Sequence, residues 1–106
     1  MKPNPKQIES VMALLKGKQI SVMQLLAVGS EKGYDRSTTS TTKFSMKVTD
    51  VVLSAGGAHL QIVSGWDTAY AVLLANVTRL TINGNRLEIE EDFETETRRL
   101  TQIKIT

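Results

Sequence analysis

The sequence contains no cysteine, which excludes disulfide bonds, thiolate zinc sites and cysteine nucleophiles. Aromatic residues are scarce at 5%, so the core must be built from Val, Ile, Leu and Met. No apolar run reaches the roughly 18 residues that a membrane span needs, and the polar residues 1–6 do not resemble a signal peptide. We therefore expect a cytoplasmic protein that makes no contact with a membrane.

The length of the chain, 106 residues, suits one hydrophobic core, so we predict a single domain over residues 1–106. The net charge is only +2, but the charges are unevenly distributed. Residues 1–47 carry eight basic and three acidic side chains, whereas residues 86–96 carry one basic and six acidic ones. Such asymmetry steers charged partners or favours self-association.

Residues 5–16 are predicted to form a helix. Asn4 is a good N-cap, Pro5 suits the first helical position, and Gln7 has the spacing of a capping box. Apolar residues then recur at the 3.6-residue spacing of an amphipathic helix. Gly17 favours the left-handed conformation that ends many helices.

From Lys18 onward, apolar residues alternate with a period of two, which predicts strands. Residues 29–42 interrupt this pattern with two glycines and a run of six Ser or Thr residues. They are predicted to form a long hairpin loop or a flexible arm. The predicted strands cover about residues 19–28, 43–53, 58–64, 69–82 with a bend near Asn76, 86–92 and 98–105.

Two segments of the chain, residues 48–62 and 77–89, repeat one pattern of a β-hairpin. In each, an apolar-Thr-charged-apolar-x-apolar stretch leads through a glycine turn to a basic residue, Leu, a polar residue and Ile, with His59 counted as basic. Asn83-Gly84 is a strong signal for a two-residue turn. The predicted fold is therefore mainly β (α+β), with one N-terminal helix packed on an antiparallel sheet of about six strands, either open or closed into a small barrel.

An alternative interpretation makes residues 35–55 a helix, because apolar residues there also fit a 3.6-residue period. The chain would then be a winged helix-turn-helix protein that places this helix in the major groove of DNA. The six consecutive Ser and Thr residues, which are poor helix formers, and the repeat both favour strands instead.

The sequence offers no convergent set of catalytic groups. His59 is the one histidine, and no partner for a catalytic or metal site lies at a useful spacing. The acidic residues 88–96 are interpreted as a solvated strand face. We predict no enzyme activity, no metal site and no cofactor. A small anionic ligand is an option at a candidate pocket formed by His59, Trp66, Asp67 and Tyr70.

The polar loop is the best candidate for binding a partner, because long loops in compact domains are uncommon unless they bind something or are disordered. Its cations and one aromatic residue are the groups that would bind. The candidate partner-binding residues are Lys32, Tyr34, Arg36, Lys43 and Lys47.

Residues 58–82 resemble the first half of an Sm-like RNA-binding barrel. The resemblance rests on the helix that comes first, a turn at residues 65–67 and the apolar stretch 70–77 that follows it. It implies a small barrel that binds RNA. The chain differs from that family in having two long strands before this segment and no Arg-Gly turn, so the resemblance covers only a quarter of the chain.

These observations favour a non-catalytic binding or assembly module that engages a protein partner or further copies of itself. The alternative is a nucleic-acid-binding protein, either a small Sm-like barrel or a winged helix-turn-helix protein. Small size and segregated charge are typical of accessory proteins of bacteria and phages, and we expect such an origin.

Overall fold

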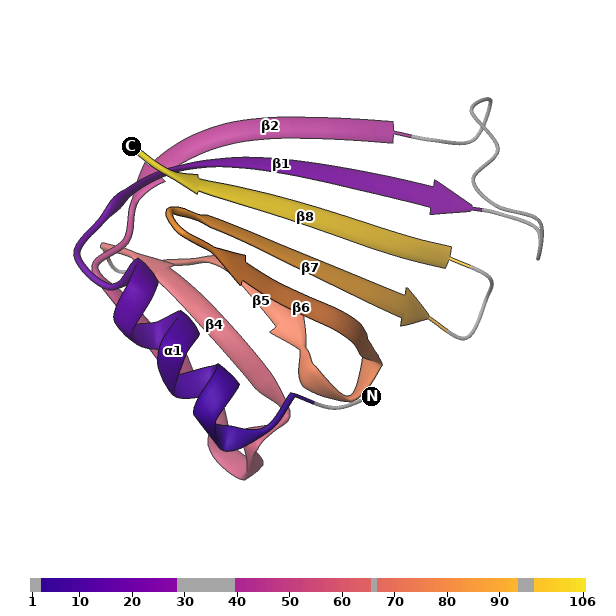
Figure 1. Ribbon diagram of the computed structural model, residues 1–106, viewed down its shortest axis with the longest axis horizontal. Helices are drawn as coiled ribbons and strands as arrows, with labels where there is room; N and C mark the ends of the chain where they lie inside the picture. The colour runs from indigo at the N-terminus through magenta and orange to yellow at the C-terminus, as the bar shows by residue number, and fades with distance from the viewer. Residues whose placement is uncertain (1–2, 29–39, 66, 94–96) are drawn as a thin grey trace.

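The computed structural model describes residues 3–28, 40–65, 67–93 and 97–106. One α-helix and eight strands make up most of this part of the chain (Figure 1). The elements in order are α1 (Pro5–Leu15), β1 (Gln19–Val28), β2 (Ser40–Lys47), β3 (Asp50–Leu53), β4 (His59–Ser64), β5 (Asp67–Leu73), β6 (Val77–Asn83), β7 (Arg86–Phe93) and β8 (Thr97–Ile105), with short 3-10 turns at Ala55–Gly57 and Leu74–Asn76.

Helix α1 begins with the predicted capping box and ends within one residue of the predicted bound. The Gln7 backbone N–H donates to Oδ1 of Asn4 at 2.8 Å, and the Asn4 N–H donates to Oε1 of Gln7 at 3.0 Å. Gly17 follows with a φ of 77° and donates its N–H to the carbonyl oxygen of Val48 at 2.9 Å. None of the helical segments in the described part of the chain has the length and hydrophobicity that a membrane span requires.

The strands form two antiparallel sheets. The five-stranded sheet has the order β2-β1-β8-β7-β6, and the three-stranded sheet has the order β3-β4-β5. This architecture confirms the predicted mainly β fold with one N-terminal helix. The described strands number eight in two sheets rather than about six in one, and both sheets are open, so they form no closed barrel.

The two extra strands arise because two of the long predicted strands break where the chain passes from one sheet to the other. The first break lies between Val48, whose N–H donates to the carbonyl oxygen of Lys18 at 2.8 Å, and Thr49, whose N–H donates to that of Val63 at 2.8 Å. The second break is the 3-10 turn Leu74–Asn76 between β5 and β6. Strands β2 and β3 also show that the helical interpretation of residues 35–55 is wrong over residues 40–53.

Both predicted hairpins are present, but they lie in different sheets. Residues 48–62 contain the β3–β4 hairpin of the smaller sheet, and residues 77–89 contain the β6–β7 hairpin of the larger one. The turn of the second hairpin consists of Gly84 and Asn85, one residue later than predicted, and Gly84 has the positive φ that this turn requires. The repeat in sequence therefore does not produce one continuous sheet.

The hydrophobic core lies between the inner faces of the two sheets, and α1 contributes its buried face to the same core. The opposite, outer face of the five-stranded sheet is not covered by any described element, as expected for an antiparallel sheet with one solvated face. The buried core residues are Ile8, Val11, Leu15, Ile20, Val22, Val48, Val51, Leu60, Ile62, Tyr70, Val72, Leu74, Val77, Leu87, Ile89 and Ile103.

Candidate functional site

Three of the five residues predicted to bind a partner, Lys32, Tyr34 and Arg36, lie outside the described residues, as do residues 29–39 of the predicted loop. The other two, Lys43 and Lys47, are exposed on β2. Lys43 stands opposite Met23 of β1, so both lysines belong to the outer face of the five-stranded sheet. Both residues fall within the strand predicted over residues 43–53, and the described strand begins three residues earlier, at Ser40.

The four residues predicted to form a ligand pocket are not brought together where the structure describes them. His59 begins β4 and is exposed, whereas Asp67 pairs with Ser64 at the other end of that strand. Tyr70 is buried against the core, on the face opposite to His59. Trp66 and the side chain of Asp67 lie outside the described residues.

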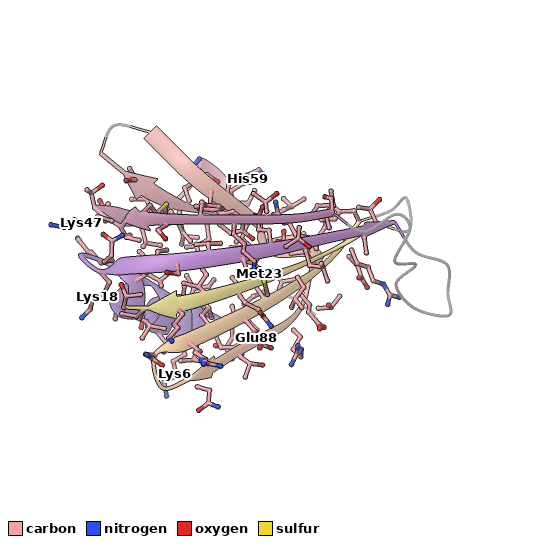
Figure 2. All side chains as sticks on the ribbon, turned by 90° about the horizontal axis from the view of Figure 1, so that it is seen from above. Lys6, Lys18, Met23, Lys47, His59 and Glu88 are labelled. Carbon is pink, nitrogen blue, oxygen red and sulfur yellow. The ribbon has the colours of Figure 1, made fainter. Side chains whose placement is uncertain are left out.

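A hollow of about 320 Å³ opens on the outer face of the five-stranded sheet. We call it the basic hollow, because Lys43, Arg86 and Lys104 line it. Met23 of β1 and Glu88 of β7, which also line it, are labelled over the middle of this face in Figure 2. Ser21 and Gln102 complete the set of polar and flexible side chains around it.

The register of the sheet explains why a hollow forms there. Ser21 stands between Ser45 of β2 on one side and Lys104 of β8 on the other. Two small serine side chains therefore sit side by side on neighbouring strands, among the long side chains of Lys43 and Met23 in the adjacent row. Of the two serines, Ser21 lines the hollow, and its short side chain leaves space among the longer side chains of Met23, Lys43 and Lys104.

Charges toward β6 and along β7 on the outer face are paired. Arg79 of β6 binds Glu88 at 3.2 Å and Glu90 at 2.9 Å. Arg98 of β8 binds Asp92 of β7 at 3.3 Å. The three acidic residues of β7 on this face thus each have a basic neighbour, but Glu88 and Glu90 share Arg79, so three carboxylates face two cations.

The cations of the basic hollow have no such partners. Among the described residues, no acidic side chain lies within 4.0 Å of the charged groups of Lys43, Arg86 or Lys104. Glu88 lines the hollow, but it is already bound by Arg79 and accepts a hydrogen bond from Gln102 at 3.3 Å. The hollow is therefore a site of uncompensated positive charge.

Arg86 and Lys104 are direct cross-strand neighbours in the β7–β8 ladder. Like charges directly opposite each other on one sheet face are destabilising, whereas opposite charges in such pairs stabilise by roughly 0.2–1 kcal/mol. We therefore expect the pair to lower the stability of the free protein, and an anion bound there would meet two cations side by side.

A second cluster of ionisable groups lies in the interior between the two sheets. The carboxylate of Glu91, which is fully buried, accepts two hydrogen bonds from Arg99, both at 2.8 Å. It also accepts from the hydroxyl of Tyr70 at 3.3 Å and from the Leu73 N–H at 3.4 Å. The hydroxyls of Tyr70 and Thr101 are hydrogen-bonded to each other.

This buried network holds the two sheets together. Arg99 also donates to the carbonyl oxygen of Ala71 at 3.0 Å, so side chains of the larger sheet satisfy the backbone of β5 at both Ala71 and Leu73. Burial, followed by the charge of Glu91, raises the pKa of Tyr70 to about 12. No buried side-chain nitrogen or oxygen of the described residues lacks a hydrogen-bond partner. The network is therefore complete in itself, and its role is structural.

Arg86 and Lys104 were not identified from the sequence, although both occupy outward positions beside inward apolar residues. Arg86 precedes the inward Leu87 and Lys104 follows the inward Ile103, so the alternation of the strands predicts that both cations face outward. What the sequence did not reveal is that β8 lies between β1 and β7, which brings Lys43 and Ser21 to the same place.

Comparisons with protein-family models, with curated proteins and with solved structures found no match to this chain. The function is therefore argued from the geometry of the described residues.

Proposed function

We propose that this protein is a non-catalytic binding module that engages an acidic segment of a protein partner at the basic hollow. The observation that carries the proposal is the difference between two parts of one sheet face. Arg79 and Arg98 are matched by carboxylates, whereas Lys43, Arg86 and Lys104 are not matched by any described residue. Complementary charge on a partner would supply the missing anions and accelerate its association.

The shape and lining of the hollow suit side chains of a peptide. Its volume of about 320 Å³ is at the lower end of the range for ligand sites. Met23 offers apolar surface, Gln102 and Ser21 offer hydrogen bonds, and the three cations surround them. A carboxylate of the partner would replace water at the cations while its aliphatic part contacts Met23.

Nucleic acid is the alternative partner, and two features weigh against it. No aromatic residue lines the basic hollow, so it lacks a platform on which bases would stack. Glu88, Glu90 and Asp92 of β7 continue the same face and outnumber Arg79 and Arg98, so this part of the face is negative and would repel a phosphate backbone long enough to cross it. Oligonucleotides therefore serve as competing probes.

The non-catalytic part of the proposal rests on the chemistry of the lining. The hollow presents no histidine, and its single carboxylate, Glu88, is bound by Arg79 and Gln102. Cations alone bind and orient anions but do not transfer protons or attack substrates near neutral pH. We place this module in the cytoplasm, since a chain without cysteine needs no oxidising compartment.

A titration with a fluorescein-labelled peptide that alternates Glu and Val tests the proposal, with labelled single- and double-stranded DNA and RNA oligomers as competing ligands. We expect the peptide to bind, and the Lys104→Gln variant to bind it about fivefold or more weakly, because one cation of the hollow is lost. The matched control is Lys6→Gln, which makes the same change in net charge at an exposed position of α1 and should leave the affinity unchanged within about twofold.

Three outcomes contradict the proposal: the peptide does not bind at low ionic strength, Lys104→Gln and Lys6→Gln weaken it equally, or the oligomers bind more tightly than the peptide through the same residues. The molar mass of the free protein, measured by light scattering, tests whether the partner is a second copy of the chain. Dimers that Lys104→Gln dissociates would show that the acidic segment belongs to the protein itself.

A further inference from the structure

Three side chains that line the basic hollow form one row across the neighbouring strands β7, β8 and β1. Arg86 stands opposite Lys104, and Lys104 stands opposite Ser21. The row continues to Asn83 of β6 at one end and to Ser45 of β2 at the other, and neither of these is charged. The row therefore presents a guanidinium, an ammonium and a hydroxyl group to the hollow, all of them hydrogen-bond donors, and contains no carboxylate.

The side chains of Arg86 and Lys104 lie in the closer of the two kinds of cross-strand pair. The Ile105 N–H donates to the carbonyl oxygen of Asn85 at 2.9 Å, so these two residues form a hydrogen-bonded pair. The next pair along the ladder, Arg86 and Lys104, is then a non-hydrogen-bonded pair. The Cα atoms of such pairs are only about 4.5 Å apart. Both long side chains span more than this separation, so their charged groups can contact one small anion together.

Lys43 lines the hollow at a different place. It stands opposite Met23, one row further along the sheet, and two strands separate it from Lys104. With strands about 4.8 Å apart and a rise of about 3.4 Å per residue, the Cα atoms of Lys43 and Lys104 are roughly 12 Å apart. The hollow thus holds a pair of cations on one side and a single cation on the other, and these meet different groups of a bound partner.

The paired cations match a doubly charged anion better than a carboxylate. A carboxylate would compensate only one of their two charges. A phosphomonoester carries a charge of about −1.5 to −2 at pH 7 and three acceptor oxygens, and a guanidinium binds phosphate through two parallel N–H···O bonds. Glu88, the carboxylate of the lining, lies in the next row and is bound by Arg79 and Gln102.

We propose that Arg86 and Lys104, together with the hydroxyl of Ser21, bind a phosphorylated serine or threonine of the acidic partner segment, and that Lys43 contacts a carboxylate of the same segment. This inference rests on the proposed function, because it names the group of the partner that occupies the hollow. Recognition of phosphorylated segments by clustered cations is a recurring mode of peptide binding. A nucleic-acid phosphodiester carries a single charge, so it matches the pair less well.

The test uses three short fluorescein-labelled peptides of alternating Glu and Val. One central Glu is kept in the first, replaced by Ser in the second and replaced by phosphoserine in the third. We expect the phosphoserine peptide to bind at least about tenfold more tightly than the Glu peptide, which corresponds to roughly 1.4 kcal/mol. The Ser peptide should bind more weakly than both, because it brings no anion to the paired cations.

Substitutions that leave the charge of the protein unchanged show where the phosphate binds. Ser21→Ala removes one donor of the row and should lower the preference for phosphoserine over Glu by at least about threefold. The matched control is Ser45→Ala, which removes the same hydroxyl from the neighbouring strand, at a position that is not part of the described lining, and should leave the preference unchanged. Arg86→Gln should abolish most of the preference, whereas Lys43→Gln should weaken the binding of both peptides by similar factors.

Equal affinities of the wild type for the phosphoserine and Glu peptides would overturn the phosphate inference, and so would equal effects of Ser21→Ala and Ser45→Ala. Inorganic phosphate that competes as well as the phosphoserine peptide would overturn it too, since the partner segment would then contribute nothing. If the Glu peptide binds and depends on Lys104 but phosphoserine brings no gain, the proposed function stands and only this inference fails. If none of the three peptides binds, the proposed function fails with it.

Discussion

The hydroxyl of Tyr70 is enclosed between the two sheets, where it contacts Glu91 and Thr101. From the sequence, Tyr70 was a candidate for binding a ligand, because it lies near Trp66 and Asp67 in the chain. Its place in β5 instead directs it inward, with 6% of its surface exposed. The carboxylate beside it and the loss of water both disfavour the phenolate.

This environment predicts a pH dependence of stability. In the unfolded chain Tyr70 loses its proton near pH 10.0, whereas in the native protein its pKa is about 12. Between these values the unfolded state binds fewer protons, so the free energy of unfolding falls as pH rises, by roughly 3 kcal/mol in total. The stabilisation is complete below pH 10 and is lost by about pH 12.

Urea unfolding of the wild type and of Tyr70→Phe across this pH range measures the effect. The variant begins less stable, because Glu91 and Thr101 lose a hydrogen-bond partner, but it should lack the extra decline above pH 10. If the free energy of unfolding fell equally in the two proteins above pH 10, the assigned pKa of Tyr70 would be contradicted.

Among the strands, β5 depends on side chains for part of its backbone pairing. It pairs with β4 on one side, and on the other side Glu91 and Arg99 bind the backbone at Leu73 and Ala71. A buried ion pair of this kind adds little net stability over an apolar pair, but removing one partner leaves a charge without compensation. The pair therefore determines how the smaller sheet is placed on the larger one.

Substitution of Arg99 tests this role. We expect Arg99→Met to lower the free energy of unfolding by about 3–5 kcal/mol, because the carboxylate of Glu91 would stay buried and unpaired. Glu91→Gln should cost less, since the amide oxygen still accepts hydrogen bonds and Arg99, which is 22% exposed, retains access to water. Urea unfolding of both variants checks the order. An Arg99→Met variant as stable as the wild type would show that the pair does not fasten β5.

Elements with strong local signals were predicted well. The capping box at Asn4 set the start of α1, and the turn near Gly84 set the β6–β7 hairpin. The breaks at Val48 and at residues 74–76 were missed, because apolar residues are frequent on both sides of each break and hide the change of phase, in which Val48 is followed by Val51 and Leu74 by Val77 on the buried face. Local periodicity reports which face is buried, and it carries no information about which sheet a strand joins.

The candidate site was predicted only in part, because local periodicity does not report which strands become neighbours. Lys43 and Lys47 follow from the cationic character of their segment, whereas the contributions of Arg86 and Lys104 depend on the order β2-β1-β8-β7. Strand order is a property of long-range pairing, so a single sequence does not reveal which cations become neighbours. The sequence shows the charge imbalance between residues 1–47 and 86–96. It does not show which of these charged side chains form ion pairs in the folded protein.

On the scale of the whole molecule, the outer face of the five-stranded sheet separates into two parts. Toward β6 and the ends of β7 and β8, three carboxylates are paired with two cations. Around the basic hollow, Arg86 and Lys104 stand opposite each other without a described carboxylate. The proposed function assigns this excess of positive charge to the binding of an acidic partner.

We expect the cations of the basic hollow to destabilise the free protein. The most direct measurement is the free energy of unfolding of Lys104→Gln at low ionic strength, made both in the wild-type background and in an Arg86→Gln background. Removing the repulsion between Lys104 and Arg86 should raise the stability by up to about 1 kcal/mol, and added salt should shrink this gain. In the Arg86→Gln background, where the repulsion is already absent, Lys104→Gln should bring no such gain. A Lys104→Gln variant that is equal to or less stable than the wild type at low ionic strength would contradict the claim.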